Sequence, residues 1–211
     1  MAEQEGAFDV YGYRFAVRGD SGPAVEGVRH DFAFFRSPPA GGEFTIELCE
    51  QEPDFEGLPD CPASVYTPRN VAYRDGRRTY FDYHGEGLGI LDRHERSFRV
   101  ISTRRHLLYE AAYLFLLSDI GQHLDRRRMH RIHALAMSLN GRAILVLLPM
   151  GGGKSTLGAY LLRRPELQIL SDDSPFVDSR GGLHAFPLHL GLLSGAEEEI
   201  PAEHRRMVDR M

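Results

Sequence analysis

The sequence predicts an α/β protein, α+β overall, in which a β-rich N-terminal region precedes a core with a mixed sheet. Three observations support this class. Apolar and polar residues alternate in short segments up to residue 101, which is the period of half-buried strands. The period then changes to that of an amphipathic helix. Beyond the helix, a strand pattern, a glycine-rich loop, a helix pattern and another strand pattern follow in that order. We therefore divide the chain into residues 1–104 and residues 105–211.

The first region is expected to consist of strands and loops. Residues 11–17 and 43–48 largely alternate, and residues 70–81 are typical of a hairpin with Asp75-Gly76 as its two-residue turn. Residues 89–91 and 97–101 are expected to pair around residues 92–96. Segments rich in glycine and proline at 37–42 and 53–62 are expected to be loops.

A helix is predicted over residues 107–124, where apolar residues recur at helical spacing. Arg126, Arg127, Arg128 and Arg131 follow it. Two interpretations of these arginines stay open. They are either cations that interact favourably with a helix C-terminus or a patch that binds substrate.

The second region continues with strand patterns. Residues 132–139 alternate imperfectly, and Asn140-Gly141 indicates a hairpin turn. Residues 143–148 are a continuous apolar run, as expected of a strand buried on both faces. A helix is predicted over residues 154–164, before Pro165, and a short buried strand over residues 167–170. Such a unit is typical of a partly parallel sheet.

Composition and charge limit the class of protein. The 211 residues are 42% hydrophobic and 26% charged with a net charge of -5, which favours a globular fold over a non-specific nucleic-acid binder. Cys49 and Cys61 match no metal-ligand spacing and are interpreted as reduced thiols. The longest apolar run, residues 111–117, is far shorter than the roughly 20 residues that cross a bilayer. The N-terminus is polar and resembles no secretory signal. We expect a cytoplasmic protein with no nucleic-acid or membrane partner, and a homo-oligomer stays open.

The glycine-rich loop is similar to a phosphate-binding loop (P-loop). The usual pattern is Gly, four residues, Gly, Lys and then Ser or Thr. Gly153, Lys154 and Ser155 fit its end, whereas Leu148 occupies the position of the opening glycine. The alternative is a glycine-rich turn that only links a strand to a helix.

Each residue of this loop has an expected role in nucleotide binding. Met150, Gly151, Gly152 and Gly153 supply backbone N–H groups for anionic oxygens, and Thr156 completes the run that begins the helix. Lys154 would contact the β and γ phosphates, and the hydroxyl of Ser155 would complete a shell around Mg²⁺. These roles predict a P-loop core that binds ATP and Mg²⁺.

Two carboxylates, Asp172 and Asp173, follow the strand predicted at residues 167–170. Ligands of α/β proteins collect at the carboxyl ends of strands. One carboxylate can hold Mg²⁺, and the other can take a proton from an attacking hydroxyl. The alternative is a polar turn, because Asp and Ser are common turn residues.

Together these residues resemble the catalytic domain of the HPr serine kinase/phosphorylase family, whose loop is shared with ATP-dependent phosphoenolpyruvate carboxykinases. His133-Ala134 lies 21 residues before Lys154, the loop matches at 151–155, and the Asp pair matches at 171–173. A softer match is the segment 182–187, and the resemblance covers roughly residues 125 to 190.

The resemblance implies roles for particular residues. His133 would lie near the transferred phosphate, Lys154 would bind it, Asp172 would be the general base, and Asp173 with Ser155 would serve the metal. It also implies a kinase that phosphorylates a hydroxyl of a protein or peptide. The β-rich first region and a core shortened at its C-terminus, with a helix near Val208, are most similar to diverged relatives. Those relatives occur beside radical enzymes and PqqD-like proteins in peptide-modification cassettes.

Two other functions remain compatible with the same residues. One is a nucleotide-binding accessory or scaffold protein that does not turn over ATP. The other is a P-loop NTPase. The substrate and the role of the β-rich region do not follow from the sequence.

Overall fold

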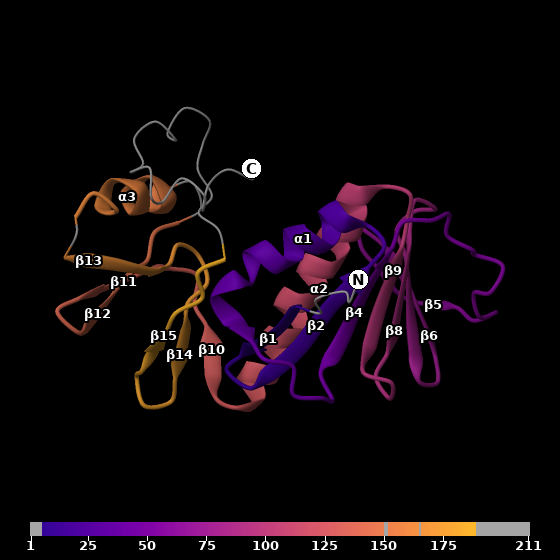
Figure 1. Ribbon diagram of the computed structural model, residues 1–211, viewed down its shortest axis with the longest axis horizontal. Coiled ribbons are helices and arrows are strands. Elements are labelled where there is room, and N and C mark those ends of the chain that lie inside the picture. Colours follow the sequence, from indigo (N-terminus) through magenta and orange to yellow (C-terminus); the bar gives the residue numbers. More distant parts are fainter. Residues whose placement is uncertain (1–5, 150–151, 165, 189–211) are drawn as a thin grey trace. The chain divides into compact units, whose positions relative to one another are not determined.

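The computed structural model describes residues 6–149, 152–164 and 166–188. The described chain is a mixed α/β protein with a nine-stranded mixed sheet, three α-helices and two three-stranded antiparallel sheets (Figure 1). The predicted α/β class is therefore confirmed at this level. The chain divides into two compact units, Met1–Ile120 and Gly121–Met211.

The first unit contains the nine-stranded sheet in the order β3-β1-β2-β4-β9-β8-β7-β6-β5. Its strands are β1 (Gly6–Val10), β2 (Tyr13–Gly19), β3 (Arg36–Ser37), β4 (Phe44–Cys49), β5 (Ala63–Tyr66), β6 (Val71–Asp75), β7 (Arg78–Asp82), β8 (Leu88–Asp92) and β9 (Ser97–Ile101). The pairs β2–β4 and β4–β9 are parallel and the other pairs are antiparallel, which makes the sheet mixed.

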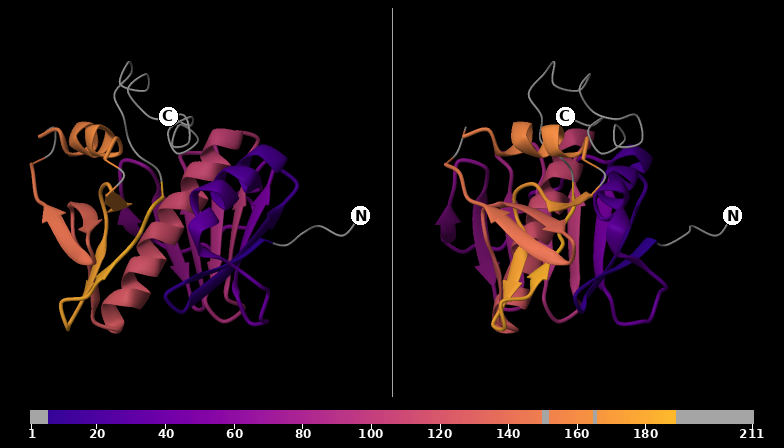
Figure 2. Two further views of the ribbon diagram at one scale, coloured as in Figure 1. Left: turned by 60° about the vertical axis from the view of Figure 1, so that its left-hand side comes forward. Right: turned by 90° about the vertical axis from the view of Figure 1, so that its left-hand side faces the viewer.

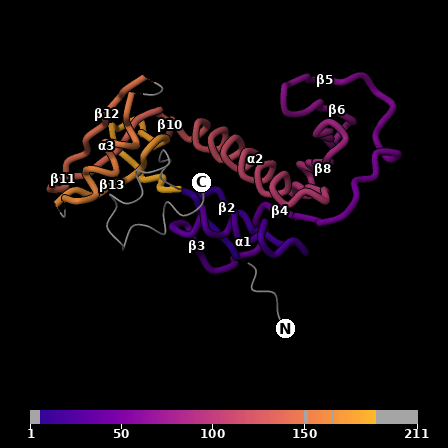
Figure 3. Tube along the Cα trace, turned by 90° about the horizontal axis from the view of Figure 1, so that it is seen from above, coloured from indigo at the N-terminus to yellow at the C-terminus, as the bar shows by residue number. Residues whose placement is uncertain are grey.

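Two helices, α1 (Gly22–Asp31) and α2 (Arg105–Arg126), pack on the apolar face of this sheet, and a short 3₁₀ helix, η1 (Ala33–Phe35), follows α1. Phe32, just after α1, contacts the rings of Phe8 and Phe15, and Phe115 of α2 stacks on Phe98 with ring centroids 4.2 Å apart. The view from above shows α2 on the side toward which β4, β8 and β6 curve (Figure 3). Alternation along the strands thus places one face against the helices.

The strands predicted from alternation are confirmed as β2, β4, β6, β7, β8 and β9, and the predicted long helix is α2. One detail differs. Asp75 pairs with Arg78, so the two-residue turn is Gly76-Arg77 rather than Asp75-Gly76. The helix α1 was not predicted, because Gly22 and Gly27 weaken the helical signal. A Cβ at Gly27 would lie 2.9 Å from the Tyr109 ring, so this glycine permits α1 to approach α2 closely.

The second unit contains the end of α2 and two short sheets, which Figure 2 shows with α3 at one end of the unit. Its elements are β10 (Met129–Arg131), β11 (Leu135–Leu139), β12 (Arg142–Val146), α3 (Lys154–Leu161), β13 (Leu167–Ser171), β14 (Phe176–Asp178) and β15 (Leu183–His184). The sheet orders are β10-β14-β15 and β12-β11-β13.

The mixed sheet predicted for this unit is wrong for the described residues, because every pair in its two sheets is antiparallel. The hairpin turn at Asn140-Gly141 is confirmed, and both residues have positive φ, 50° and 74°. This turn returns β12 antiparallel along one edge of β11, and β13 then pairs with the other edge.

The apolar run at residues 143–148 is not a strand buried on both faces. It forms β12, an edge strand, and Ile144 is 36% exposed while Leu147, just beyond the strand, is 65% exposed. An apolar run alone does not distinguish a central strand from an edge strand, since the number of neighbouring strands is a tertiary property.

Two further expectations concern the whole chain. The change from strands to helix lies at the start of α2. The division between the compact units falls later in the sequence, after Ile120 inside this helix. The domain boundary at residue 104 stays a prediction. The helix expected near Val208 lies outside the described residues. Within the described ranges, no helix has both the length and the apolar character that crossing a bilayer requires.

Candidate functional site

The loop between β12 and α3 presents Lys154 as the first residue of the helix. Gly153 caps this helix in the left-handed conformation, with φ 84° and ψ 21°, which favours glycine. A Cβ at Gly152 would lie 2.9 Å from the carbonyl oxygen of Pro149, so a side chain there would push the loop apart. Met150 and Gly151, which were predicted to supply further N–H groups, lie outside the described residues.

Lys154 turns its side chain back toward the loop and is only 8% exposed. Its Nζ donates a hydrogen bond to the Leu148 carbonyl at 2.9 Å and lies 2.9 Å from Nε2 of His133. An ammonium group has three N–H donors, so these two contacts leave one donor. No described carboxylate forms an ion pair with Lys154. The side chain is therefore a buried cation whose two partners are both neutral.

His133 is positioned by the backbone on either side of it. It lies between β10 and β11, where the N–H of Ile132 donates to Pro175 O at 2.9 Å and the N–H of Ala134 donates to Asp173 O at 3.0 Å. These bonds hold the histidine against the segment that follows β13. Its Nδ1 lies 2.7 Å from Oδ1 of Asp173.

The three side chains form a continuous polar chain, the Asp173–His133–Lys154 chain. An ammonium donates hydrogen bonds and accepts none, so Nε2 of His133 is the acceptor of the hydrogen bond from Lys154. Nδ1 then carries the ring proton and donates it to Asp173. In this chain of three side chains, the carboxylate of Asp173 and the imidazole of His133 are half-exposed, at 56% and 55%, and the ammonium of Lys154 is buried.

Asp172 and Asp173 lie in the turn after β13, and hydrogen bonds of Ser171 and Ser174 hold this turn. Ser171 accepts the N–H of Ser174 at 3.1 Å through its hydroxyl, and Ser174 donates its own hydroxyl to Oδ2 of Asp173 at 2.8 Å. Both carboxylate oxygens of Asp173 thus have partners within the protein. Asp172 directly follows the strand and is half-buried.

The structure brings three of the predicted site residues, His133, Lys154 and Asp173, into contact. The two predicted metal ligands, Ser155 and Asp173, form no hydrogen bond with each other in the part of the chain that the structure describes. In the same described ranges, no cluster of three His, Cys, Asp or Glu side chains could hold a metal ion. Ser155 is half-buried and Thr156 exposed on the first turn of α3. The metal site and the base role of Asp172 stay predictions.

Two partners in this site were missed by sequence reasoning. The Leu148 carbonyl binds Lys154, and the Ser174 hydroxyl binds Asp173. Leu148 carried a signal, because it occupies the position where the usual loop has glycine. Its contribution is a backbone carbonyl, however, which side-chain patterns do not report.

The comparisons with known proteins identify no family for this chain. No protein-family model matches the sequence, and no curated protein matches it. The resemblance to HPr serine kinases rests on the loop, His133 and the Asp pair.

Proposed function

We propose that the second unit binds ATP with Mg²⁺ and transfers its γ-phosphoryl group to a hydroxyl of a protein or peptide. The observation that carries the proposal is the buried ammonium of Lys154, which among the described residues has two neutral partners and one unused donor. Burying a cation without a counter-charge is unfavourable, so such a group is typical of a site that receives an anion.

The surrounding backbone fits a phosphate. The first N–H groups of α3 have no carbonyl partner within the helix, and they lie at the end with the positive helix dipole. Gly152 and Gly153 keep side chains away from this end. Phosphate oxygens that approached it would accept hydrogen bonds from these amides and from Lys154.

The proposal includes Mg²⁺ in the way that nucleotide sites use it. Mg²⁺ is commonly held by one or two protein oxygens together with phosphate oxygens and water, so a three-carboxylate cluster is not needed. Ser155 would supply the protein oxygen, with Asp173 as the predicted second ligand. When bound, the metal would neutralise charge on the transferred group.

In the proposed step, Asp172 takes the proton of the acceptor hydroxyl. The acceptor oxygen then forms a bond to the γ-phosphorus, the bond from the γ-phosphorus to the bridging oxygen breaks, and ADP leaves. Lys154 donates a hydrogen bond to the phosphate oxygens throughout. His133, oriented by Asp173, acts as a positioning residue that holds the ammonium near the loop.

The test measures ATP binding by titration calorimetry and ADP release with and without candidate peptides. Lys154→Ala should weaken ATP binding about tenfold or more, because a hydrogen bond to a charged group contributes roughly 1.5–3 kcal/mol. His133→Ala should weaken it less while leaving the protein folded. The matched control is His130→Ala, since His130 also contacts an aspartate, Asp125, at 2.9 Å but does not touch Lys154.

The outcomes separate the candidate functions. ADP release that requires a hydroxyl acceptor supports the kinase, acceptor-free release indicates an NTPase, and tight binding without release indicates an accessory protein. Equal ATP affinity in the wild type and Lys154→Ala would remove nucleotide binding from this loop and contradict the proposal.

A further inference from the structure

The first unit contains a pocket of about 290 Å³ between α2 and the strands of the large sheet. The apolar part of its lining comes from both elements: Phe81, Phe98, Leu107, Ala111, Leu114 and Phe115. The volume is at the lower end of the roughly 300–1,000 Å³ that small-molecule sites occupy. It suits one compact apolar group rather than a long ligand.

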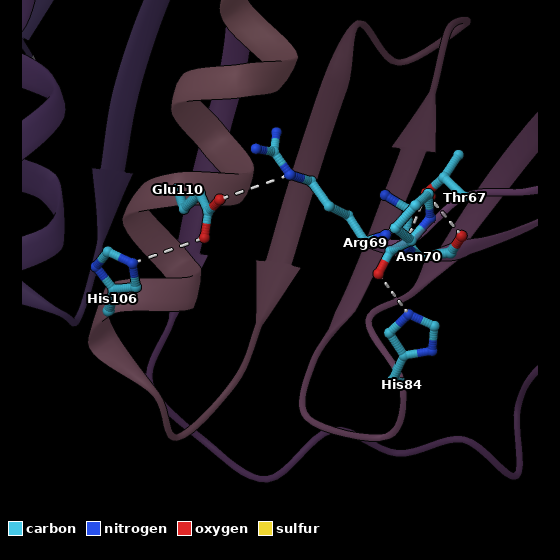
Figure 4. A network of polar contacts seen from close by, with 7 residues as sticks. Thr67, Arg69, Asn70, His84, His106 and Glu110 are labelled. Atoms are coloured by element: carbon cyan, nitrogen blue, oxygen red, sulfur yellow. Dashed lines mark hydrogen bonds and ion pairs between the residues drawn. The ribbon is translucent and has the colours of Figure 1, made fainter.

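Two groups of opposite charge lie at this pocket. Nε of Arg69 is 3.9 Å from one carboxylate oxygen of Glu110, and Nε2 of His106 is 3.7 Å from the other (Figure 4). Both distances are longer than a hydrogen bond. No described residue accepts a hydrogen bond from the Arg69 guanidinium. Arg69 and Glu110 thus form an ion pair that is longer than a hydrogen bond, so most of the guanidinium donors and carboxylate acceptors are not used by this pair.

The position of Arg69 is set by the turn before β6. The hydroxyl of Thr67 accepts the N–H groups of Arg69 at 3.2 Å and of Asn70 at 2.9 Å. The Pro68 carbonyl contacts the His84 ring at 3.2 Å (Figure 4). These bonds hold the backbone that presents the guanidinium at the pocket.

A third polar residue, Tyr83, lines the same pocket. No described residue forms a hydrogen bond with its hydroxyl. Burial, and then the charge of Glu110, raises the pKa of Tyr83, so the hydroxyl stays a donor near neutral pH.

We propose that this pocket binds an apolar α-amino acid as its zwitterion. The ligand carboxylate accepts hydrogen bonds from the Arg69 guanidinium, whose planar geometry matches a carboxylate. The ligand ammonium donates to Glu110, and the apolar side chain occupies the space between Phe98, Leu114 and Phe115. A ligand with both charges pairs with both Arg69 and Glu110. A ligand with one charge pairs with only one of these two residues.

The experiment titrates the full chain with L-phenylalanine and L-leucine, and with two analogues of phenylalanine that each lack one charge. These analogues are 3-phenylpropionate, without the amine, and phenethylamine, without the carboxylate. Arg69→Gln and Glu110→Gln should each weaken amino-acid binding about five- to tenfold, because the contacts are charged but partly exposed. Glu110→Gln should not weaken 3-phenylpropionate binding, and Arg69→Gln should not weaken phenethylamine binding, because each variant removes a charge of the same sign as that ligand.

Two further variants complete the design. Arg104→Gln is the matched control, because Arg104 is an exposed arginine that pairs with Glu86 at 2.7 Å and does not line the pocket. Leu114→Trp should fill the pocket and abolish binding while melting curves remain cooperative. The proposal is overturned if the folded wild type binds neither amino acid, if the charge variants bind as the control does, or if 3-phenylpropionate binds as tightly as phenylalanine. None of these outcomes depends on Lys154 or on ATP.

Discussion

Both compact units of the chain bury aromatic and charged side chains, but the buried charges have different partners. Asp92 and Asp119 of the first unit contact Arg78 and Arg93, whereas Lys154 of the second unit contacts an imidazole and a carbonyl. In Met1–Ile120, the helices and the large sheet enclose aromatic residues, and Phe8, Phe15 and Phe98 are almost completely buried. In Gly121–Met211, the described strands are short, the edge strand β12 leaves Ile144 partly exposed, and Lys154 is a buried charge.

This difference is the reason that we place the proposed phosphate site in the second unit. The aromatic rings of the first unit satisfy one another, so they need no further partner in that core. The buried ammonium of the second unit has a cost in desolvation that its neutral neighbours only partly offset. Groups that are unfavourable for folding persist where they serve a site, which is why we propose phosphate binding for the second unit.

The largest expected effect tests whether catalysis belongs to the second unit. Asp172→Asn keeps the shape of the side chain but cannot accept a proton. It should therefore lower phosphotransfer by about 10²–10⁴, the usual contribution of a general base, with ATP affinity nearly unchanged. The measurement is phosphotransfer to the acceptor at saturating ATP. A rate equal to that of the wild type would leave the Asp pair as a turn only.

The neighbouring variant sharpens the role of Asp173. If this residue holds the metal, Asp173→Asn should raise the magnesium concentration that phosphotransfer requires, and excess magnesium should restore the rate. If it orients His133, as its 2.7 Å contact indicates, magnesium should not restore the rate and ATP affinity should fall. A magnesium series separates these two results.

A stability comparison tests the difference in burial between Phe98 and Ile144. Phe98→Ala should lower the free energy of unfolding by about 3–5 kcal/mol, because Phe98 is 1% exposed and stacks on Phe115. Ile144→Ala in β12 should lower it by about 1 kcal/mol or less, because its side chain is already partly in solvent. Urea denaturation followed by circular dichroism measures both. Similar losses would show that β12 is covered in solution.

The smallest expected effect is an acid dependence in the second unit. The His184 contact at 2.8 Å, then the N–H groups of Gly182 and Arg180, lower the pKa of Asp178 from 3.8 to about 2. The unfolded chain therefore binds this proton at higher pH than the folded chain does. The stability that Asp178 contributes is present above pH 3.8 and is lost as pH falls toward 2.

Melting temperatures of the wild type and Asp178→Asn measure this contribution. The wild type should be more stable near neutral pH, and the difference should shrink as the pH is lowered through this window. Asp125→Asn, which removes an exposed contact with His130, is the control. A difference that stays constant with pH would contradict the role of Asp178.

Much of the secondary structure could be predicted because its causes are local. The alternation that predicted β4 and β9, the apolar stripe of α2 and the Asn140-Gly141 turn each depend on residues close together in the chain. Two glycines concealed α1 from the same reasoning. The loop, His133 and the Asp pair were also recognised as site candidates from residue type and spacing.

The sequence by itself therefore determined α2, many of the strands and the residue types of the candidate site. Only the tertiary structure decided that β13 pairs with β11, that β12 is an exposed edge, and that Asp173 contacts His133. It also decided that Arg69 and Glu110 meet at an apolar pocket. The physical reason is that these features join residues distant in the chain. Which distant residues meet depends on how whole strands and helices bury their apolar faces together, and local patterns do not specify that.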